Sequence, residues 1–472
     1  MLKNKYVWLV LVAIFFLYSF KLSNLYLNQD EAMFALNAVN ITPSFYFWHL
    51  DNFWATPVIV YWSSIFLKFL PFNEASVRFP TAFLAVINIG LMMYLTNLLF
   101  KKKYLAILSG ILLATTPAFF VNSRLLLDNI YPVTFVLLWL IFLFKNKFFL
   151  SGLTLGIGIH SYHAAKIYMP LYFLLSLPRV ASAKWGWFIV GFLIPIILFI
   201  PWLRAHPDTL TNQVSYVSSI DRQIGTNFVR NYLSYFDPAI LFTTGDKTLI
   251  HSTGRTGVFL FPLVSLLVFG ALHTITQKNY FGKLILIGFL TYPLAPAIIN
   301  DPGRISRALV VISFGILLSI YGVKFMLESK EKLLKPIFYF LLSFIFLSFI
   351  FFLNDYFGNY RVRSRAVFNN NVGGAFESVL KSAQIRPVEK VYIDKNIFQA
   401  KYYFEFYKQK LRIYPKEVSF FDPNSEDFTK LPKGTIFVSS KKFQTLGNFE
   451  IIETVRELDG VESYFVYWND EN

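Results

Sequence analysis

The sequence predicts an α-helical membrane protein with about eleven transmembrane helices and a small α/β domain at its C-terminal end. Three observations predict this class. The chain of 472 residues is 55% hydrophobic and only 15% charged, which is too apolar for an ordinary soluble enzyme. Apolar runs of spanning length continue to about residue 353. The basic residues behind the net charge of +16 form short clusters between these runs, which favours cytoplasmic loops over a nucleic-acid-binding surface.

The basic clusters orient the spans, because lysine and arginine are enriched in cytoplasmic loops. Two lysines place the N-terminus inside, and the first span, about 6–23, is uncleaved because no small-residue cleavage site follows it. The triple lysine at 101–103 places the end of the second span, about 75–100, inside. The later spans alternate in the same way, and the eleventh, about 336–353, leaves the C-terminal part outside.

The chain is predicted to divide into a transmembrane domain, residues 1–353, and an extracytoplasmic α/β domain, residues 354–472. The first domain carries two long outer loops, about 24–73 and about 204–255, and loops of this length are usually functional. Alternating and apolar runs in the second domain predict helices near 374–383 and 398–407, and strands at 390–394, 435–439 and 463–468. Cysteine is absent, which excludes thiolate chemistry.

The predicted topology gathers the polar features on the outer face. A charged group costs about 2.5–3.5 kcal/mol at the centre of a transmembrane helix, so one-sided clustering indicates a site. The features are the pair Asp30 and Glu31, the pair Arg124 and Asp128, the segment 160–166, the loop 204–255 and the segment 301–307.

Asp30 and Glu31, directly after the first span, allow two interpretations. Structurally, acids in the first turn of a helix cap free N–H groups and favour the positive end of the helix dipole. Functionally, one carboxylate is a general base for an incoming hydroxyl, and its neighbour tunes it or holds a divalent cation through oxygen ligands. The two interpretations are compatible, because a helix N-terminus can also position a catalytic group.

Arg124 and Asp128 are four residues apart and are expected on one helical face. They form either an intrahelical ion pair, worth a few tenths of a kcal/mol, or a second acid with a phosphate-binding guanidinium.

In the segment 160–166, two histidines three apart are a weak metal signal without placed carboxylates. Lys166 is the better candidate, for an anionic ligand. Arg304 and Arg307, also three apart, face either the same anion or the lipid headgroups.

The order of these motifs resembles the GT-C membrane glycosyltransferases, in particular family 39, which includes protein O-mannosyltransferases and the bacterial aminoarabinose transferase of lipid A. The resemblance covers about residues 5–365. It rests on Asp30-Glu31, Glu74-Ala75-x-x-Arg78-Phe79-Pro80, Arg124-x-x-x-Asp128, Ser161-Tyr162-His163-Ala164-Ala165-Lys166, the segment 232–238 with Gly245-Asp246 and His251-Ser252, and Arg304-x-x-Arg307.

The resemblance implies transfer of a sugar, with inversion, from a polyprenyl-phosphate carrier to a glycan, lipid or protein acceptor at the outer face of the cell membrane. The family's general base maps to Asp30, with Glu31 beside it, and a second acid maps to Asp128. A departing phosphate needs cations, and the candidates are Arg124, Lys166, Arg304 and Arg307. Candidate substrate-binding residues are Tyr162, His163 and His251. A divalent cation, held by Asp30 and Glu31 if present, stays an open alternative.

The sequence departs from the family in one place. Many relatives carry Asp-Lys-Pro-Pro in the first outer loop, whereas residues 51–57 read Asp-Asn-Phe-Trp-Ala-Thr-Pro, without the lysine. Lys166 is the predicted substitute.

Two other functions are weighed. A transporter or flippase of lipid-linked saccharides favours mid-span charges and broken helices in inverted repeats, but here the charges stay at one face. A ligase or polymerase with lipid-diphosphate donors differs only in its donor.

Overall fold

The computed structural model of the chain describes residues 5–42, 45–48, 54–209, 224–277, 279–298, 301–423, 431–443 and 449–469. They form two compact units. The helical unit comprises Met1–Phe20, Ile41–Ser63 and Arg78–Tyr356, and the sheet unit comprises Lys21–Asn40, Ser64–Val77 and Phe357–Asn472. The predicted division into 1–353 and 354–472 therefore left out two N-terminal segments that pack with the C-terminal part of the chain.

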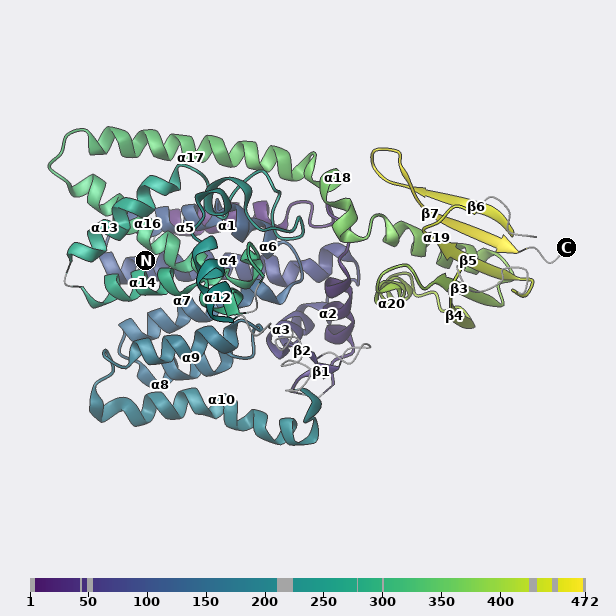
Figure 1. Cartoon of the computed structure of the whole chain (residues 1–472), viewed down its shortest axis with the longest axis horizontal. Helices are drawn as coiled ribbons and strands as arrows, with labels where there is room; N and C mark the ends of the chain where they lie inside the picture. Colours follow the sequence, from purple (N-terminus) through teal and green to yellow (C-terminus); the bar gives the residue numbers. More distant parts are fainter. Residues whose placement is uncertain are drawn as a thin grey trace. The chain divides into compact units, whose positions relative to one another are not determined.

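Long helices of the helical unit, such as α10 and α17, run nearly parallel or antiparallel to one another (Figure 1). Short 3-10 or π turns interrupt them, and a two-residue antiparallel ribbon, β1 (Phe47–Trp48) with β2 (Trp54–Ala55), precedes α3. The helices, of which α3, α4 and α17 extend past the unit boundary, are α1 (Lys5–Ser19), α3 (Pro57–Leu67), α4 (Glu74–Phe100), α5 (Lys103–Ala114), α6 (Pro117–Ser123), α7 (Tyr131–Phe144), α8 (Phe148–Gly158), α9 (Ala165–Ser176), α10 (Trp185–Ala205), α12 (Ile224–Ser234), α13 (Leu263–Thr276), α14 (Tyr280–Thr291), α15 (Leu294–Ile298), α16 (Val310–Glu328) and α17 (Leu334–Phe357).

Membrane-spanning helices confirm the predicted class. In the described residues, five helical stretches are long and apolar enough to cross a membrane, or six if α5 and α6, bent by 65°, form one span. The five are α4, Ser182–Ala205, Tyr280–Ile298, α16 and α17. The central α16 is 83% buried over its apolar window, whereas the windows of Ser182–Ala205 and α17 are only 22% buried. Such outward-facing apolar surface suits contact with lipid.

Close helix packing holds α16 in place. The Gly270 Cα of α13 lies so near α16 that an added Cβ would stand 1.8 Å from the carbonyl oxygen of Leu318. An added Cβ at Gly322 would stand 2.1 Å from the carbonyl oxygen of Leu266. Small residues at facing positions let two helix backbones meet, which is the usual basis of packing within membranes. The α13–α16 pair is thus a firm base for the segment that precedes α16.

The sheet unit contains a five-stranded mixed sheet with the order β4-β3-β5-β7-β6. Strands β3 (Lys390–Asp394), β4 (Glu417–Phe421) and β5 (Thr435–Ser439) are parallel, and β7 (Glu462–Asn469) runs antiparallel to β5 and to β6 (Phe449–Arg456). This confirms the predicted α/β class and the three predicted strands. Strands β4 and β6 were not predicted. Both are edge strands with exposed positions, so they lack the continuous apolar run of the fully buried β5.

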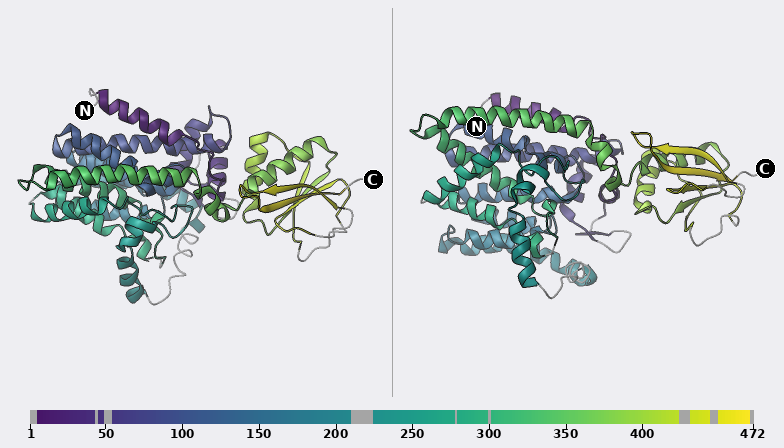
Figure 2. Two further views of the ribbon diagram at one scale, coloured as in Figure 1. Left: turned by 90° about the horizontal axis from the view of Figure 1, so that it is seen from above. Right: turned by 45° about the horizontal axis from the view of Figure 1, so that its top comes forward.

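Helices cover one face of this sheet (Figure 2). Helix α19 (Val372–Ile385) packs against β5, β6 and β7, and α20 (Ala400–Leu411) lies beside α19. The N-terminal helix α2 (Gln29–Val39) packs against α20. A short helical stretch, α18 (Tyr360–Ser364) with the 3-10 turn η5 (Arg365–Phe368), leads from α17 to α19.

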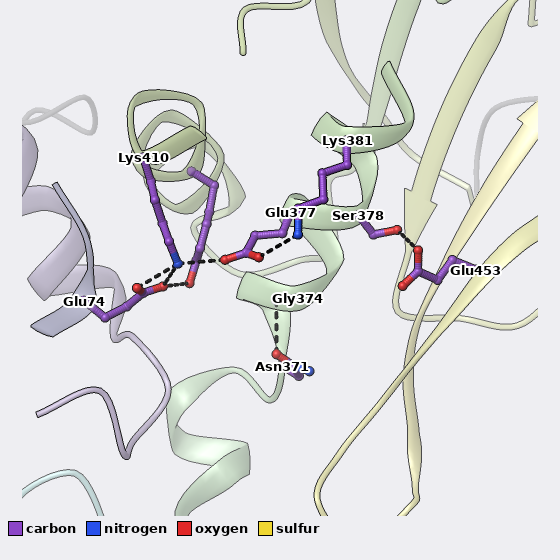
Figure 3. A network of polar contacts seen from close by, with 9 residues as sticks. Glu74, Asn371, Gly374, Glu377, Ser378, Lys381, Lys410 and Glu453 are labelled. Carbon is purple, nitrogen blue, oxygen red and sulfur yellow. Dashed lines mark hydrogen bonds and ion pairs between the residues drawn. The ribbon is translucent and has the colours of Figure 1, made fainter. Parts of the chain in front are cut away.

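A charge network joins three segments of the sheet unit (Figure 3). The Lys410 ammonium in α20 donates to both carboxylate oxygens of Glu74, at 2.7 and 2.8 Å, and to Glu377 Oε1 in α19, at 2.7 Å. The Tyr407 hydroxyl donates to the same Glu74 carboxylate at 2.9 Å. Charge-assisted hydrogen bonds of this kind are about twice as strong as neutral ones, so the network ties residues 64–77 to the C-terminal helices.

Candidate active site

Asp30 and Glu31 open helix α2, as the sequence predicted. Asn28 is the N-cap residue, and its side chain accepts a hydrogen bond from the Asp30 N–H at 2.9 Å. The Glu31 Oε2 accepts a hydrogen bond from the Asn28 N–H at 3.0 Å, which completes a capping box. Glu31 is 0% exposed. The capping interpretation is therefore confirmed, and Glu31 is the acid that carries it.

The Asp30 carboxylate has a different environment. Its side chain is exposed to water, and within the described residues no hydrogen bond or ion pair reaches its carboxylate oxygens. The protein around it still removes enough solvent to raise its pKa to about 6, and the neighbouring charge of Glu31 adds to this effect. An accessible carboxylate with a pKa just below neutral suits a general base.

Neighbouring segments of the sheet unit fix the start of α2. The Gln29 Oε1 lies 3.4 Å from both the Asn369 amide nitrogen and the Tyr403 hydroxyl, and these two groups are 3.0 Å apart. Together with the packing of α2 on α20, these contacts determine the direction in which Asp30 points.

Arg124 and Asp128 do not share a helical face, and that expectation was wrong. Helix α6 ends at Ser123, and Asp128 begins the separate 3-10 turn η1 (Asp128–Ile130). A four-residue spacing pairs side chains only where the helix is continuous. The Asp128 Oδ2 instead accepts a hydrogen bond of 2.8 Å from the Thr56 hydroxyl, 72 residues away.

Arg124 is 2% exposed, and its guanidinium donates hydrogen bonds to backbone carbonyls inside the helical unit. Its Nη1 donates to the carbonyls of Leu17 and Tyr18 at 3.2 and 2.6 Å, and its Nη2 donates to the Phe20 carbonyl at 2.5 Å. These carbonyls lie at the C-terminal end of α1, where helix groups lack internal partners and where a cation is favourable. Arg124 therefore caps α1, and its role as a phosphate ligand stays a prediction.

Lys166 and Asp128 lie within electrostatic reach of each other. The charge of Asp128 acts on the Lys166 ammonium, which lies at the start of α9. The ammonium also stands 6.0 Å from the centre of the Tyr46 ring. A cation beside a carboxylate at this end of α9 suits the predicted anion-binding role.

The two histidines of the segment 160–166 do not form a metal centre with carboxylates. His160 Nδ1 lies 3.1 Å from the Tyr46 hydroxyl, and burial, aided by the charge of Lys166, lowers the pKa of His160 to about 4. The rings of Tyr162 and His163 make an edge contact at 6.3 Å. No three histidine or acidic side chains converge anywhere in the described residues. Substrate binding by Tyr162 and His163 stays a prediction.

Arg304 and Arg307 converge on one carboxylate, Asp301, which the sequence did not single out. The Asp301 Oδ2 lies 3.2 Å from Arg304 Nε and 3.4 Å from Arg307 Nη2. A third cation, Lys247, lies 3.8 Å from Asp301 Oδ1. These side chains are partly accessible, from 12% exposed for Arg307 to 62% for Lys247.

The backbone of this arginine segment is held from several sides. The Asp246 carboxylate accepts hydrogen bonds from the Ser306 N–H at 2.6 Å and from the Thr248 N–H at 2.8 Å. The Tyr235 hydroxyl donates to the Asp301 carbonyl at 2.7 Å, and the Lys247 N–H donates to the Gly303 carbonyl at 2.8 Å. The segment is thus positioned by contacts that do not involve the Asp301 carboxylate.

His251 links this region to the turn that carries Asp128. Its Nδ1 lies 2.7 Å from Asn122 Oδ1 and 3.2 Å from Asn129 Nδ2. Burial lowers the pKa of His251 to about 4; the charge of Asp246 opposes this shift and those of the two arginines support it. A neutral, hydrogen-bonded histidine is a positioning group, and direct contact of His251 with substrate stays a prediction. The turn η1 also lies against the 3-10 turn η4 (Ile305–Arg307), so Asp128 and the arginines belong to one polar region of the helical unit.

The sequence alone does not identify several of these groups, because their partners are distant along the chain. Asp301 stands in the segment 301–307, where the sequence points to a role for the two arginines only. Gly245-Asp246 matches a motif of the family, and the match assigns it no role. The only available signal was that both acids lie in loops rich in polar residues. Residues 51–53, part of the stretch without the family lysine, lie outside the described residues.

Comparison with known proteins confirms the predicted class. Over residues 54–204 the chain matches the model of the family described as dolichyl-phosphate-mannose-protein mannosyltransferase. The matched region is about a third of the chain, and it indicates a glycosyltransferase similar to this family.

The fold is shared with solved structures of ArnT from Cupriavidus metallidurans. The structure of ArnT bound to undecaprenyl phosphate has a TM-score of 0.59 at 12% identity and covers 99% of this chain and 98% of ArnT. The apo structure has a TM-score of 0.55 at 11% identity, with 98% and 97% covered. A search of curated proteins gives no match. At such low identity the likeness establishes the fold.

Proposed function

We propose that this glycosyltransferase moves a sugar, with inversion, from a polyprenyl-phosphate carrier to an acceptor hydroxyl at the outer face of the cell membrane. Asp30 is the general base. The observation that carries this role is the exposed Asp30 carboxylate at a capped helix start, with a pKa raised to about 6. In contrast, the adjacent Glu31 is buried and used by the cap.

In the proposed reaction a carboxylate accepts the proton of the acceptor, and cations stabilise the departing phosphate. The acceptor oxygen forms a bond to the anomeric carbon from the face opposite the carrier, and the bond between that carbon and the phosphate oxygen breaks. The electron pair leaves with the phosphate, and the acceptor proton passes to Asp30. Lys166, Arg304 and Arg307 stabilise the charge that develops on the phosphate. Asp128, held by Thr56, is the second acid and keeps Lys166 charged.

Three observations support a polyprenyl-phosphate donor. The related fold of ArnT was solved with undecaprenyl phosphate. The helical unit offers clustered cations, which a phosphate requires. Its outer helices also expose apolar surface to lipid, so a lipid carrier can approach from within the bilayer.

We infer eleven spans. Besides the six long or bent stretches, α1, α7 with its preceding turn, α8 and α13 are apolar but shorter, and α9 forms the return of a hairpin after α8. Shorter helices can cross where the bilayer thins or the span is buried by its neighbours. An odd number of spans with an inside N-terminus places the C-terminal part of the chain outside.

Transfer by the purified full chain tests the proposal. The chain is incubated with polyprenyl-monophosphate sugars carrying a labelled sugar and with membrane extracts as acceptor source. We expect free polyprenyl phosphate and label on an acceptor. Asp30→Asn is expected to abolish transfer at unchanged membrane abundance, whereas Asp237→Asn, an exposed acid of the helical unit, is expected to transfer normally.

The other outcomes identify the alternatives. Label that crosses vesicles without bond cleavage would support a transporter, and the bend between α5 and α6 is a feature that such a protein shares. Turnover with lipid-diphosphate sugars only would support a ligase or polymerase. Wild-type transfer by Asp30→Asn would remove Asp30 from the mechanism.

A further inference from the structure

We propose that the Asp301 carboxylate is a resident counter-ion that occupies the place of the carrier phosphate and competes with it, so that the spent carrier can leave. This inference rests on the proposed function, because it takes the ligand of the cation cluster to be the phosphate of a polyprenyl carrier. The cation cluster means Lys247, Arg304 and Arg307.

The geometry of the cluster supports a replaceable anion. Three cations from two loops surround a single carboxylate, at 3.2, 3.4 and 3.8 Å. The contact to Arg304 is an ion pair by distance, but the Arg304 Nε–H makes no hydrogen bond within the described residues. A strong Asp–Arg ion pair is usually bidentate, with two linear hydrogen bonds. Asp301 therefore neutralises the cluster without saturating it.

The position of the segment does not depend on the Asp301 carboxylate. Tyr235 bonds the Asp301 carbonyl oxygen, Asp246 bonds the Ser306 N–H, and Tyr168 bonds the Arg307 carbonyl at 3.2 Å. The carboxylate can swing away, or be replaced by an amide, while the backbone stays anchored. The side chain is also 25% exposed, which gives an entering anion access to it.

The charges explain why competition helps turnover. A carrier linked to a sugar is a phosphodiester with one negative charge. After transfer it is a monoester, which carries about −1.5 to −2 at pH 7. Three cations alone would therefore hold the product more strongly than the substrate. A tethered carboxylate that returns to the cluster lowers the affinity for both, and it offsets the product inhibition that the extra charge would cause.

Neutralising Asp301 should strengthen binding of the spent carrier. We expect Asp301→Asn to bind undecaprenyl phosphate about twofold to fivefold more tightly than wild type, the range for losing a competing, partly exposed ion pair. Asp301→Glu, which keeps the charge, should stay near wild type. Asp237→Asn is the matched control, because it removes the same charge from an exposed aspartate of the same unit that makes no ion pair in the described residues.

The assay is a binding titration of the purified full chain in nanodiscs with undecaprenyl phosphate, repeated with the uncharged polyprenol and at high salt. The gain of Asp301→Asn should be absent with polyprenol and smaller at high salt. In turnover, the same variant should show a lower KM for the donor, a lower kcat and stronger inhibition by undecaprenyl phosphate. Asp301→Ser repeats the measurement if the asparagine variant does not fold.

The outcomes separate this inference from the proposed function. Unchanged or weaker binding of undecaprenyl phosphate by both neutral variants, with wild type binding it well, would overturn the counter-ion role alone. Tighter binding in a protein that transfers no sugar would support the counter-ion and refute the transfer reaction. No preference of wild type for undecaprenyl phosphate over polyprenol would refute both.

Discussion

Protonation of Asp30 should make the transfer rate depend on pH. One substitution should shift the midpoint of that dependence. Glu31→Gln removes the like charge beside Asp30. It is also expected to preserve helix α2, because glutamine serves at this position of a capping box as well as glutamate. Its amide oxygen can accept the hydrogen bond from the Asn28 N–H that Glu31 Oε2 now accepts at 3.0 Å. The substitution therefore changes electrostatics with little change in structure.

The magnitude follows from the pKa of the base. With a pKa of about 6, Asp30 is ionised in about nine tenths of molecules at pH 7 and in about one tenth at pH 5. A base works only when ionised, so wild-type kcat/KM should fall about tenfold for each pH unit below 6. In Glu31→Gln the midpoint should move to lower pH. It should remain above the ordinary value of 3.8, because burial is the larger cause of the shift and is unchanged.

The assay is the initial rate of label transfer between pH 4.5 and 8.5 at constant ionic strength. Each profile is scaled to its own maximum, so that differences in expression do not matter. Glu389→Gln, which changes an exposed glutamate of the sheet unit, is the control for a general effect of charge. A wild-type midpoint near 4 would refute the argument that partial desolvation raises the pKa of Asp30, and a midpoint in Glu31→Gln that stays or rises would refute the role of the neighbouring charge.

Two further predictions concern the cations of the helical unit. Lys166→Met should lower transfer about 100-fold, the usual cost of one group that stabilises developing charge. Arg124→Met should cost about 3 kcal/mol of stability, since three carbonyls at the end of α1 lose a charged donor. The measurement is the Tm of the purified protein, which should be lower. The folded fraction should bind undecaprenyl phosphate normally. Weakened binding at an unchanged Tm would instead show that Arg124 is a phosphate ligand.

The sequence predicts local structure correctly where neighbours along the chain determine it. The capping box needs only Asn28 and Glu31, three residues apart, and it was anticipated as an acidic helix start. Strand β5 is buried along its whole length and reads as a continuous apolar run. The sequence does not predict the edge strands β4 and β6, because their exposed positions resemble those of loops.

The site could be predicted only as a list of residues, because its geometry comes from distant parts of the chain. Asp128 meets Thr56 across 72 residues, and Asp301 meets Lys247 from another loop. No periodicity connects such pairs. Arg124 was misread for a related reason. Its spacing to Asp128 suggested one helix, whereas the helix ends between them and the guanidinium turns to the end of α1.

The charge network around Lys410 has a consequence for biosynthesis. Helix α2 and the segment with Glu74 leave the ribosome early, but α20, on which α2 packs and from which Lys410 reaches Glu74, is made only after the last membrane helix. Synthesis of α20 thus completes the support of the helix that carries Asp30. A chain whose spans are all inserted but whose α20 is not yet made lacks this support for the start of α2.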